Sequence, residues 1–378
     1  MKKIEMVDLK SQYLNIKSEV DAAIQEVLDS AVFVKGGKVD VFRQHFADYL
    51  QVKHVIPVAN GTDALMISLM ALDLKPGDEV IAPSFTFVST AEVVSMLGLN
   101  LVLVDVDPDT YCISVSEIEN AITPNTKVII PVHLFGQNAD MQNIMQIAKE
   151  HNLYVVEDAC QSVGAYYTFP NGNKVHSGCI GDIGCTSFFP SKNLGCYGDG
   201  GAIFTNNDEF ALKMQSIANH GMQVRYQYER VGVNSRLDTL QAAVLDVKLS
   251  RFDSYLAARL VASDYYREHL KTVEWLRLPV VGENTTHSYH QFTLVVDKYS
   301  RDDLQLYLRE NGVPTMVYYP KPLHLQEAYR TDPVKVLPVS EFLAEKVLSL
   351  PMHTELDKEQ LDYIIEKIKS FPSQIVKS

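Results

Sequence analysis

The alternation of short apolar runs with helical stretches constrains the fold of this chain more than any other feature of its sequence. Five apolar runs are predicted as strands, at residues 80–82, 101–104, 128–132, 154–156 and 202–204. Helical stretches separate them, for example at residues 141–151 and 208–219. Strands that alternate with helices pair in parallel and are covered by helices on both faces. The sequence therefore predicts an α/β domain built on a mainly parallel sheet.

We expect a second, smaller unit in the C-terminal third of the chain. A long helical pattern begins at Arg236 and bridges into this unit, with an apolar stripe at Leu237, Leu240, Val244 and Val247. Two strands and a final amphipathic helix are predicted beyond it, at residues 291–296, 315–319 and 358–370. The predicted division is a large domain over residues 1–250, which includes an N-terminal helix, and a smaller α+β domain over residues 251–378.

Composition and charge narrow the class of protein. The 378 residues are 46% hydrophobic, which is enough for a large core, and the net charge of −13 leaves no basic tract for nucleic acid. No apolar run is long enough to cross a bilayer, and the N-terminus lacks an apolar signal region. The five cysteines are odd in number and form no Cys-x-x-Cys pair, which favours reduced thiols in the cytoplasm over disulfides or a metal site.

A single lysine, Lys192, lies in a tight loop that follows a predicted strand. Residues 187–201 are Ser-Phe-Phe-Pro-Ser-Lys-Asn-Leu-Gly-Cys-Tyr-Gly-Asp-Gly-Gly, with four glycines after the lysine. Such a loop can bury the amine against a carbonyl compound, and burial lowers the pKa of a lysine toward the range in which it forms Schiff bases. The alternative is a solvent-exposed lysine, which is the more common case for this residue type.

An acidic residue, Asp158, follows the apolar strand predicted at residues 154–156. Ligands of α/β proteins bind at the carboxyl ends of parallel strands, so this carboxylate is expected to point into a crevice. There it can hold the ring nitrogen of a pyridine cofactor protonated, as pyridoxal phosphate needs when it acts as an electron sink. The alternative is a cap on the following turn or helix. The presence of Lys192 favours the cofactor role.

A third motif, Asn60-Gly61-Thr62, joins a short apolar strand to a helical pattern that carries Leu65 and Leu69 on one side. The free amides and the positive dipole end of a helix N-terminus make a phosphate site. The same residue types also serve as ordinary helix caps, so this motif is weak when it stands alone.

Together and in this order, the three motifs resemble the sugar-nucleotide aminotransferases of the DegT/DnrJ/EryC1/StrS family. Further matching segments extend the resemblance over nearly the whole chain, at residues 7–9, 60–65, 83–87, 157–161, 232–238 and 318–324. The resemblance implies pyridoxal phosphate as the cofactor and the aspartate-aminotransferase-like fold, PLP fold type I. It also implies a homodimer with shared active sites.

The resemblance implies a role for each matching residue. Lys192 would form the Schiff base with the cofactor and move the proton, while Asp158 would pair with the pyridinium nitrogen. The other cofactor contacts would be Gln161 beside the phenolic oxygen, Phe87 on the pyridine ring, Gly61, Thr62 and Ser187 on the phosphate, and Asn234 of the partner subunit on the same phosphate. Taken singly, Phe87 is better explained as a core aromatic and Asn234 as a loop residue, because buried aromatics are common.

The family further implies transamination from glutamate to a nucleotide-linked keto sugar. The segments around Lys192 and Asn60 look most like enzymes that aminate UDP-2-acetamido-2-deoxy-3-oxo-glucuronate or a close 3-oxo sugar, for surface polysaccharide or amino-sugar biosynthesis. Arg236 of the neighbouring subunit would pair with an acidic sugar or a phosphate, and its alternative is an ion pair at a helix start. Substrate contacts are also expected from Tyr318, Tyr319 and His324. Some close relatives carry His at the position of Tyr318, which leaves the sugar's identity open.

Other functions compete with this prediction. A dTDP- or UDP-linked 4-keto-6-deoxy sugar is the alternative acceptor. Dehydratases and deoxygenases of the same fold replace the lysine by His, whereas this chain has Lys192. A non-catalytic nucleotide-binding module would tolerate the loss of Lys192 or Asp158, and both are present. The polar, aromatic segment at residues 221–233 meets the partner subunit in this family, although most such segments are surface loops.

Overall fold

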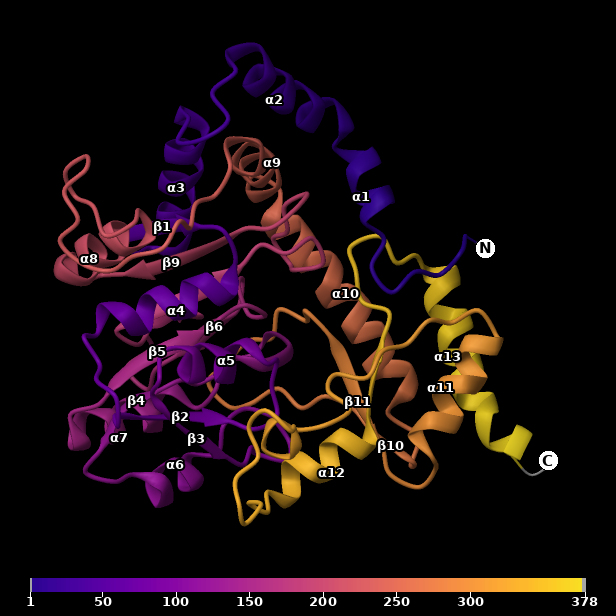
Figure 1. Cartoon of the computed structure of the whole chain (residues 1–378). Helices are drawn as coiled ribbons and strands as arrows, with labels where there is room; N and C mark the ends of the chain where they lie inside the picture. Colours follow the sequence, from indigo (N-terminus) through magenta and orange to yellow (C-terminus); the bar gives the residue numbers. More distant parts are fainter. Residues whose placement is uncertain (1, 376–378) are drawn as a thin grey trace.

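A seven-stranded sheet forms the centre of the larger part of the molecule. The computed structural model describes residues 2–375 and places these strands in the order β1-β9-β8-β5-β4-β2-β3 (Figure 1). The strands are β1 (His54–Val58), β2 (Glu79–Pro83), β3 (Asn100–Val104), β4 (Thr126–Ile129), β5 (Tyr154–Asp158), β8 (Ile183–Ser187) and β9 (Gly201–Thr205). All pairs from β8 to β3 are parallel, whereas β9 pairs antiparallel with both β8 and β1. The predicted mainly parallel sheet is therefore confirmed.

Helices cover both faces of this sheet because apolar side chains alternate along its strands. In β2, Val80 and Ala82 belong to one buried cluster, while Ile81 belongs to the cluster on the other face. The first face is covered by α4 (Gly61–Ala71), α5 (Ser89–Met96) and α8 (Asp208–Ala218). The second face is covered by α3 (Gly37–Leu50), α6 (Val115–Ala121) and α7 (Met141–His151).

Several smaller elements surround this core. The N-terminal helices α1 (Leu9–Asn15) and α2 (Lys17–Ser30) extend along its outside, where α2 packs against α9 (Thr239–Leu249) (Figure 1). A hairpin of β6 (Tyr166–Thr168) and β7 (Lys174–His176) and two short 3-10 turns, η1 (Leu134–Gly136) and η2 (Leu323–Leu325), complete the connections.

The C-terminal part contains its own three-stranded antiparallel sheet. It is made of β10 (Leu276–Arg277), β11 (Phe292–Val296) and β12 (Val347–Leu350), with β11 in the middle. Its helices are α10 (Phe252–Leu270), α11 (Arg301–Glu310), α12 (Pro338–Lys346) and α13 (Lys358–Ile375). No helix in the described residues is both long and apolar enough to span a membrane.

The strand predicted at residues 315–319 does not form, and β12 takes its place beside β11. Only Met316 of that segment pairs with the sheet, through two backbone hydrogen bonds with Ser349. Prolines at 314 and 320 bracket the segment and lack the amide donors that a longer ladder needs. By contrast, every residue of β12 is buried.

The domain boundary predicted at residue 250 falls between two helices with different neighbours. Helix α9 packs against α2 and α3, whereas α10 packs against α13. This change of neighbours agrees with the boundary, which stays a prediction.

Candidate active site

A cavity of about 630 Å³ opens at the carboxyl ends of β2, β5 and β8. Parallel sheets bind ligands at this edge, because the loops that leave the strands diverge there. Nine of the twelve predicted site residues line the cavity: Gly61, Thr62, Phe87, Asp158, Gln161, Ser187, Lys192, Tyr318 and Tyr319. Asn234, Arg236 and His324 lie outside it.

Lys192 stands on the loop that follows β8, and its backbone amide donates to the carbonyl of Phe189 at 2.8 Å. Its ammonium group has no hydrogen-bond or ion-pair partner among the described residues. Burial lowers the pKa of Lys192, while the nearby Cys160 and Asp158 act in the opposite direction. Lys192 is half-buried on the cavity wall, and an amine with a lowered pKa and no protein partner is more readily deprotonated and is free to react with a carbonyl carbon.

Asp158 ends β5, and its side chain is 6% exposed. Its carboxylate accepts a hydrogen bond from Thr90 Oγ1 at 2.9 Å and another from the amide of Cys160 at 3.1 Å. The second contact resembles the cap that was the alternative role for this residue. The first comes from α5, 68 residues earlier in the chain, and aims the carboxylate at the cavity that Lys192 also lines.

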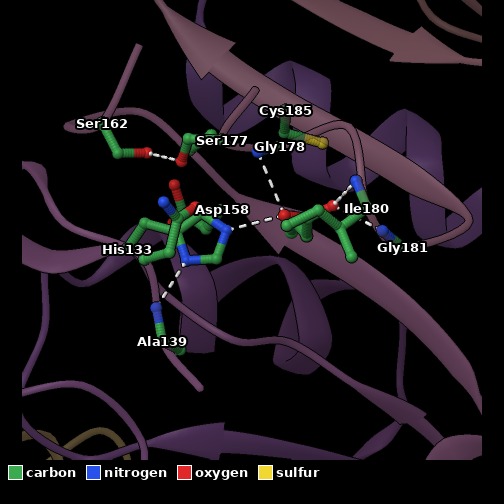
Figure 2. A network of polar contacts seen from close by, with 12 residues as sticks. His133, Ala139, Asp158, Ser162, Ser177, Gly178, Ile180, Gly181 and Cys185 are labelled. Atoms are coloured by element: carbon green, nitrogen blue, oxygen red, sulfur yellow. Dashed lines mark hydrogen bonds and ion pairs between the residues drawn. The ribbon is translucent and has the colours of Figure 1, made fainter. Parts of the chain in front are cut away.

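Behind Asp158, on the opposite face of β5, a buried network holds the end of the strand (Figure 2). The Glu157 carboxylate accepts from the amides of Gly178, Ile180 and Gly181 at 3.0, 2.6 and 2.5 Å. His133 Nε2 donates to the same carboxylate at 2.7 Å. Both side chains are fully buried.

The tautomer of His133 follows from its second nitrogen. Nδ1 accepts the amide of Ala139 at 3.1 Å, so the proton lies on Nε2 and is donated to Glu157. The backbone of His133 also donates to the carbonyl of Asp158 at 3.0 Å. Sequence analysis missed this network, although the strand's two consecutive acids point to opposite faces of the sheet.

The N-terminus of α4 forms one end of the cavity. The side chain of Asn60 caps the helix by accepting from the amide of Asp63 at 2.8 Å. A Cβ atom on Gly61 would lie 2.9 Å from Ser187 Cβ and 3.0 Å from Cys160 Sγ, so only glycine lets α4 approach β8 this closely. Amides at the start of an 11-residue helix are suited to a phosphate group.

Aromatic and amide side chains form a second wall. Gln161 is fixed at both ends: its Oε1 accepts from the amide of Phe135 at 2.7 Å, and its Nε2 donates to the hydroxyl of Tyr319 at 3.1 Å. Burial raises the pKa of Tyr319, which therefore stays neutral. Phe87 is 53% exposed and lies 6.2 Å from the Tyr319 ring, centroid to centroid. An exposed Phe87 is not the core aromatic of the alternative reading, and its ring is free to cover a flat ligand.

Two polar atoms of this cavity are buried without a partner, Nδ1 of His290 and Oγ1 of Thr86. Burial lowers the pKa of His290 well below its usual value, and the charge of Lys192 adds to this shift, so the imidazole is neutral. Buried polar atoms normally find partners, and these two are left for a ligand. The sequence offered no signal for either residue.

These features fit pyridoxal phosphate. The group needs an amine for its aldehyde, an acid for its ring nitrogen and amides for its phosphate, and Lys192, Asp158 and the start of α4 bring these groups to one cavity. The unpartnered atoms of His290 and Thr86 leave polar contacts for a bound group.

The three residues outside the cavity have different surroundings. Asn234 is exposed. Arg236 lines a separate cavity of about 430 Å³, together with Lys35 and without any carboxylate. His324 is buried, with Nδ1 2.7 Å from Ser84 Oγ and Nε2 3.1 Å from a Glu341 oxygen. Since both of its nitrogens are engaged within the protein, the expected substrate contact of His324 is not retained.

The charge balance of the cavity is acidic. Four carboxylates line it, Asp63, Glu92, Asp158 and Asp199, whereas Lys192 is the one lysine or arginine among the described residues that do so. A ligand with two or more negative charges therefore finds too few cations within one chain.

Comparisons with known proteins give consistent results. The sequence profile described as the DegT/DnrJ/EryC1/StrS aminotransferase family matches residues 14–369. The chain is 48% identical to UDP-2-acetamido-2-deoxy-3-oxo-D-glucuronate aminotransferase of Pseudomonas aeruginosa, over 96% of this chain and 98% of that protein.

Two solved structures are similar along nearly the whole chain. A DegT DnrJ EryC1 StrS aminotransferase from Brucella abortus superposes with a TM-score of 0.92 at 41% identity, covering 97% of this chain and 99% of the other. NtdA from Bacillus subtilis, solved with the cofactor PMP bound, has a TM-score of 0.87 at 35% identity, covering 95% and 82%. These similarities confirm the predicted fold class.

Proposed function

Because this chain belongs to the DegT/DnrJ/EryC1/StrS aminotransferase family, we propose that it transfers an amino group from glutamate to UDP-2-acetamido-2-deoxy-3-oxo-glucuronate or a close 3-oxo sugar. The enzyme is an aminotransferase that depends on pyridoxal phosphate. The observation that carries the proposal is the partner-free amine of Lys192 in the same cavity as the Asp158 carboxylate. The similarity to the Pseudomonas aeruginosa enzyme supports the choice of sugar.

The chain's own residues divide the chemistry. When bound, pyridoxal phosphate supplies the electron sink that stabilises negative charge at the substrate carbon. Lys192 is proposed to carry the proton to and from that carbon, which suits an amine whose pKa burial has lowered. Asp158 would hold the positive ring nitrogen of the bound cofactor, and the start of α4 would hold its phosphate. Phe87 would cover the cofactor's ring, and Gln161 presents an amide already oriented by Phe135 and Tyr319.

The acidic balance of the cavity supports a site shared between two subunits. Glutamate carries two carboxylates and a sugar nucleotide carries a diphosphate, yet Lys192 is the one cation lining the described cavity. We therefore place Arg236 and Asn234 of the partner subunit at the mouth of this cavity, as the family resemblance implies. Arg236 suits this role because no carboxylate lines the cavity that it borders within its own chain.

The place of the reaction is also a proposal. We propose that the enzyme works in the cytoplasm, where sugar nucleotides are precursors of surface polysaccharides or amino sugars. All five cysteines are free thiols, which suits a reducing compartment.

The test uses the enzyme in its pyridoxamine form and a panel of UDP- and dTDP-linked keto sugars. We expect the absorbance of the cofactor to return to the pyridoxal form fastest with UDP-2-acetamido-2-deoxy-3-oxo-glucuronate. The corresponding 3-oxo sugar nucleotide that lacks the sugar carboxylate should react more slowly. In the Arg236→Met variant, the rates with these two sugars should differ less than in the wild type. Preference for a 4-keto-6-deoxy sugar contradicts the choice of substrate, and turnover by Lys192→Ala contradicts the site.

A further inference from the structure

Lys192 stands on a loop that closes on itself. The amide of Cys196 donates to the carbonyl of Phe188 at 2.8 Å, and this bond joins the two ends of the loop. Gly195 packs so tightly against the start of the loop that a Cβ atom there would lie 2.4 Å from the carbonyl oxygen of Pro190. The position of the Lys192 backbone therefore depends on what holds the base of the loop, residues 195–197.

Lys248, near the C-terminal end of α9, holds the base of the loop from outside. Its side chain is 2% exposed, and its ammonium group donates to the carbonyl of Gly195 at 2.6 Å. The same ammonium lies 4.8 Å from the centroid of the Tyr197 ring. No carboxylate forms an ion pair with Lys248 among the described residues, so a carbonyl and an aromatic face are its main partners.

A buried ammonium group without an ion-pair partner destabilises the fold, because it loses its hydration. The lowered pKa of Lys248 has the same cause. Burial lowers the pKa of Lys248 to about 8, with the Cys196 thiol acting in the opposite direction. An unbranched hydrophobic residue would avoid the cost, but it would leave the buried Gly195 carbonyl without this donor. The ammonium is thus tied to one backbone atom of the catalytic loop.

A second residue of α9 holds the same part of the loop. Gln241 accepts from the amide of Tyr197 at 2.8 Å through Oε1 and donates to its carbonyl at 3.4 Å through Nε2. Gln241 and Lys248 are seven residues apart, which is nearly two helical turns, so both project from one face of α9. The helix itself is anchored on α2 and α3.

We propose that Lys248, assisted by Gln241, is a positioning residue that fixes the base of the loop so that the amine of Lys192 meets the reacting carbon. Lys248 is outside the cavity and does not touch the cofactor or the substrate. This inference rests on the proposed role of Lys192. Phe189, Ser191 and Asp199 of the same loop also line the cavity, but the proposed cofactor contacts come from α4, β5 and Phe87, so the effect should fall chiefly on the proton transfer by Lys192.

The test is Lys248→Met, which keeps an unbranched side chain one heavy atom shorter than lysine and removes the donor. Lys213→Met is the matched control, because Lys213 forms ion pairs at the surface with Asp73 and Glu209. In the cofactor-free protein, hydrogen exchange should become faster at residues 188–200 and stay unchanged in the sheet. In the loaded enzyme, kcat for the glutamate half-reaction should fall about tenfold or more, with KM within about twofold, because small misplacements of a catalytic group cost this much.

Three results would overturn the proposal: unchanged exchange at residues 188–200, faster exchange throughout the core, or a kcat equal to that of Lys213→Met. If Lys248→Met does not fold, Gln241→Met removes two neutral contacts of the same base and should give smaller changes in the same two measurements. A separate experiment tests the proposed function. Turnover by Lys192→Ala would refute that function, whatever the result with Lys248→Met.

Discussion

Replacing Glu157 with glutamine tests the network behind Asp158, because it changes only one carboxylate oxygen into an NH₂ group. Each carboxylate oxygen accepts two donors, Ile180 and Gly181 at Oε1 and His133 and Gly178 at Oε2. A glutamine keeps one oxygen and turns an NH₂ group toward two of these donors. His133 cannot adapt by changing its tautomer, because its Nδ1 already accepts the amide of Ala139.

The expected loss follows from these contacts. Two hydrogen bonds to a charged group disappear, each worth about 1.5–3 kcal/mol, so the free energy of unfolding should fall by about 3–6 kcal/mol. Stability of natural domains is about 5–15 kcal/mol, so the variant is expected to be severely destabilised rather than mildly affected. The loss is large because Glu157 and His133 are fully buried, and water cannot replace the missing acceptor.

The assay is urea unfolding of the cofactor-free protein, followed by far-ultraviolet circular dichroism. The matched control is Glu19→Gln, the same chemical change at a half-exposed glutamate that pairs with Arg251. This control should lose at most about 1 kcal/mol, as exposed ion pairs usually do. If Glu157→Gln unfolds within about 1 kcal/mol of Glu19→Gln, the network does not hold the end of β5 as argued.

The remaining predictions concern the site. Asp158→Asn should bind the cofactor and slow proton transfer about a hundredfold or more in single turnovers with glutamate, and normal rates would reduce Asp158 to a structural cap. Mixed dimers of Lys192→Ala and Asn234→Glu chains should regain activity, because one site of each mixed dimer then carries neither change; no recovery after proven subunit exchange contradicts the shared site. Burial lowers the pKa of Lys192 below its ordinary 10.5, so the unfolded state binds this proton more tightly than the folded state does. The cofactor-free enzyme should therefore gain stability as the pH rises from the folded-state pKa of Lys192 toward 10.5. The stability advantage of Lys192→Met over wild type in urea should therefore shrink as pH rises toward 10, and a pH-independent difference would refute the shift.

Much of the fold and of the candidate site could be predicted from local sequence patterns. The apolar strand that ends at Asp158, the glycine-bounded loop of Lys192 and the Asn60-Gly61-Thr62 turn are each encoded by consecutive residues. Their meeting in one cavity also follows from sequence, because parallel strands bring their carboxyl ends to the same edge. The order of strand and helix signals was therefore enough to predict where the candidate site lies.

Contacts between distant residues were decided by the tertiary structure. The segment at residues 315–319 has the composition of a strand, yet β12 fills that place in the sheet, and Tyr318 and Tyr319 line the cavity instead. His324 has a site-like residue type but is engaged by Ser84 and Glu341. Whether such a residue faces a ligand depends on which partners pack around it, and a local pattern does not contain that information.

The sheet could be predicted from the periodicity of the sequence, and Lys192 and Asp158 could be predicted as site residues from their neighbours in the chain. Only the tertiary structure revealed Glu157 with His133 and Lys248 with Gly195, which lie 24 and 53 residues apart. A buried carboxylate or ammonium is tolerated only where folding brings donors or acceptors to it, and those partners come from other elements. The groups that support the candidate site are therefore visible only after the chain has folded.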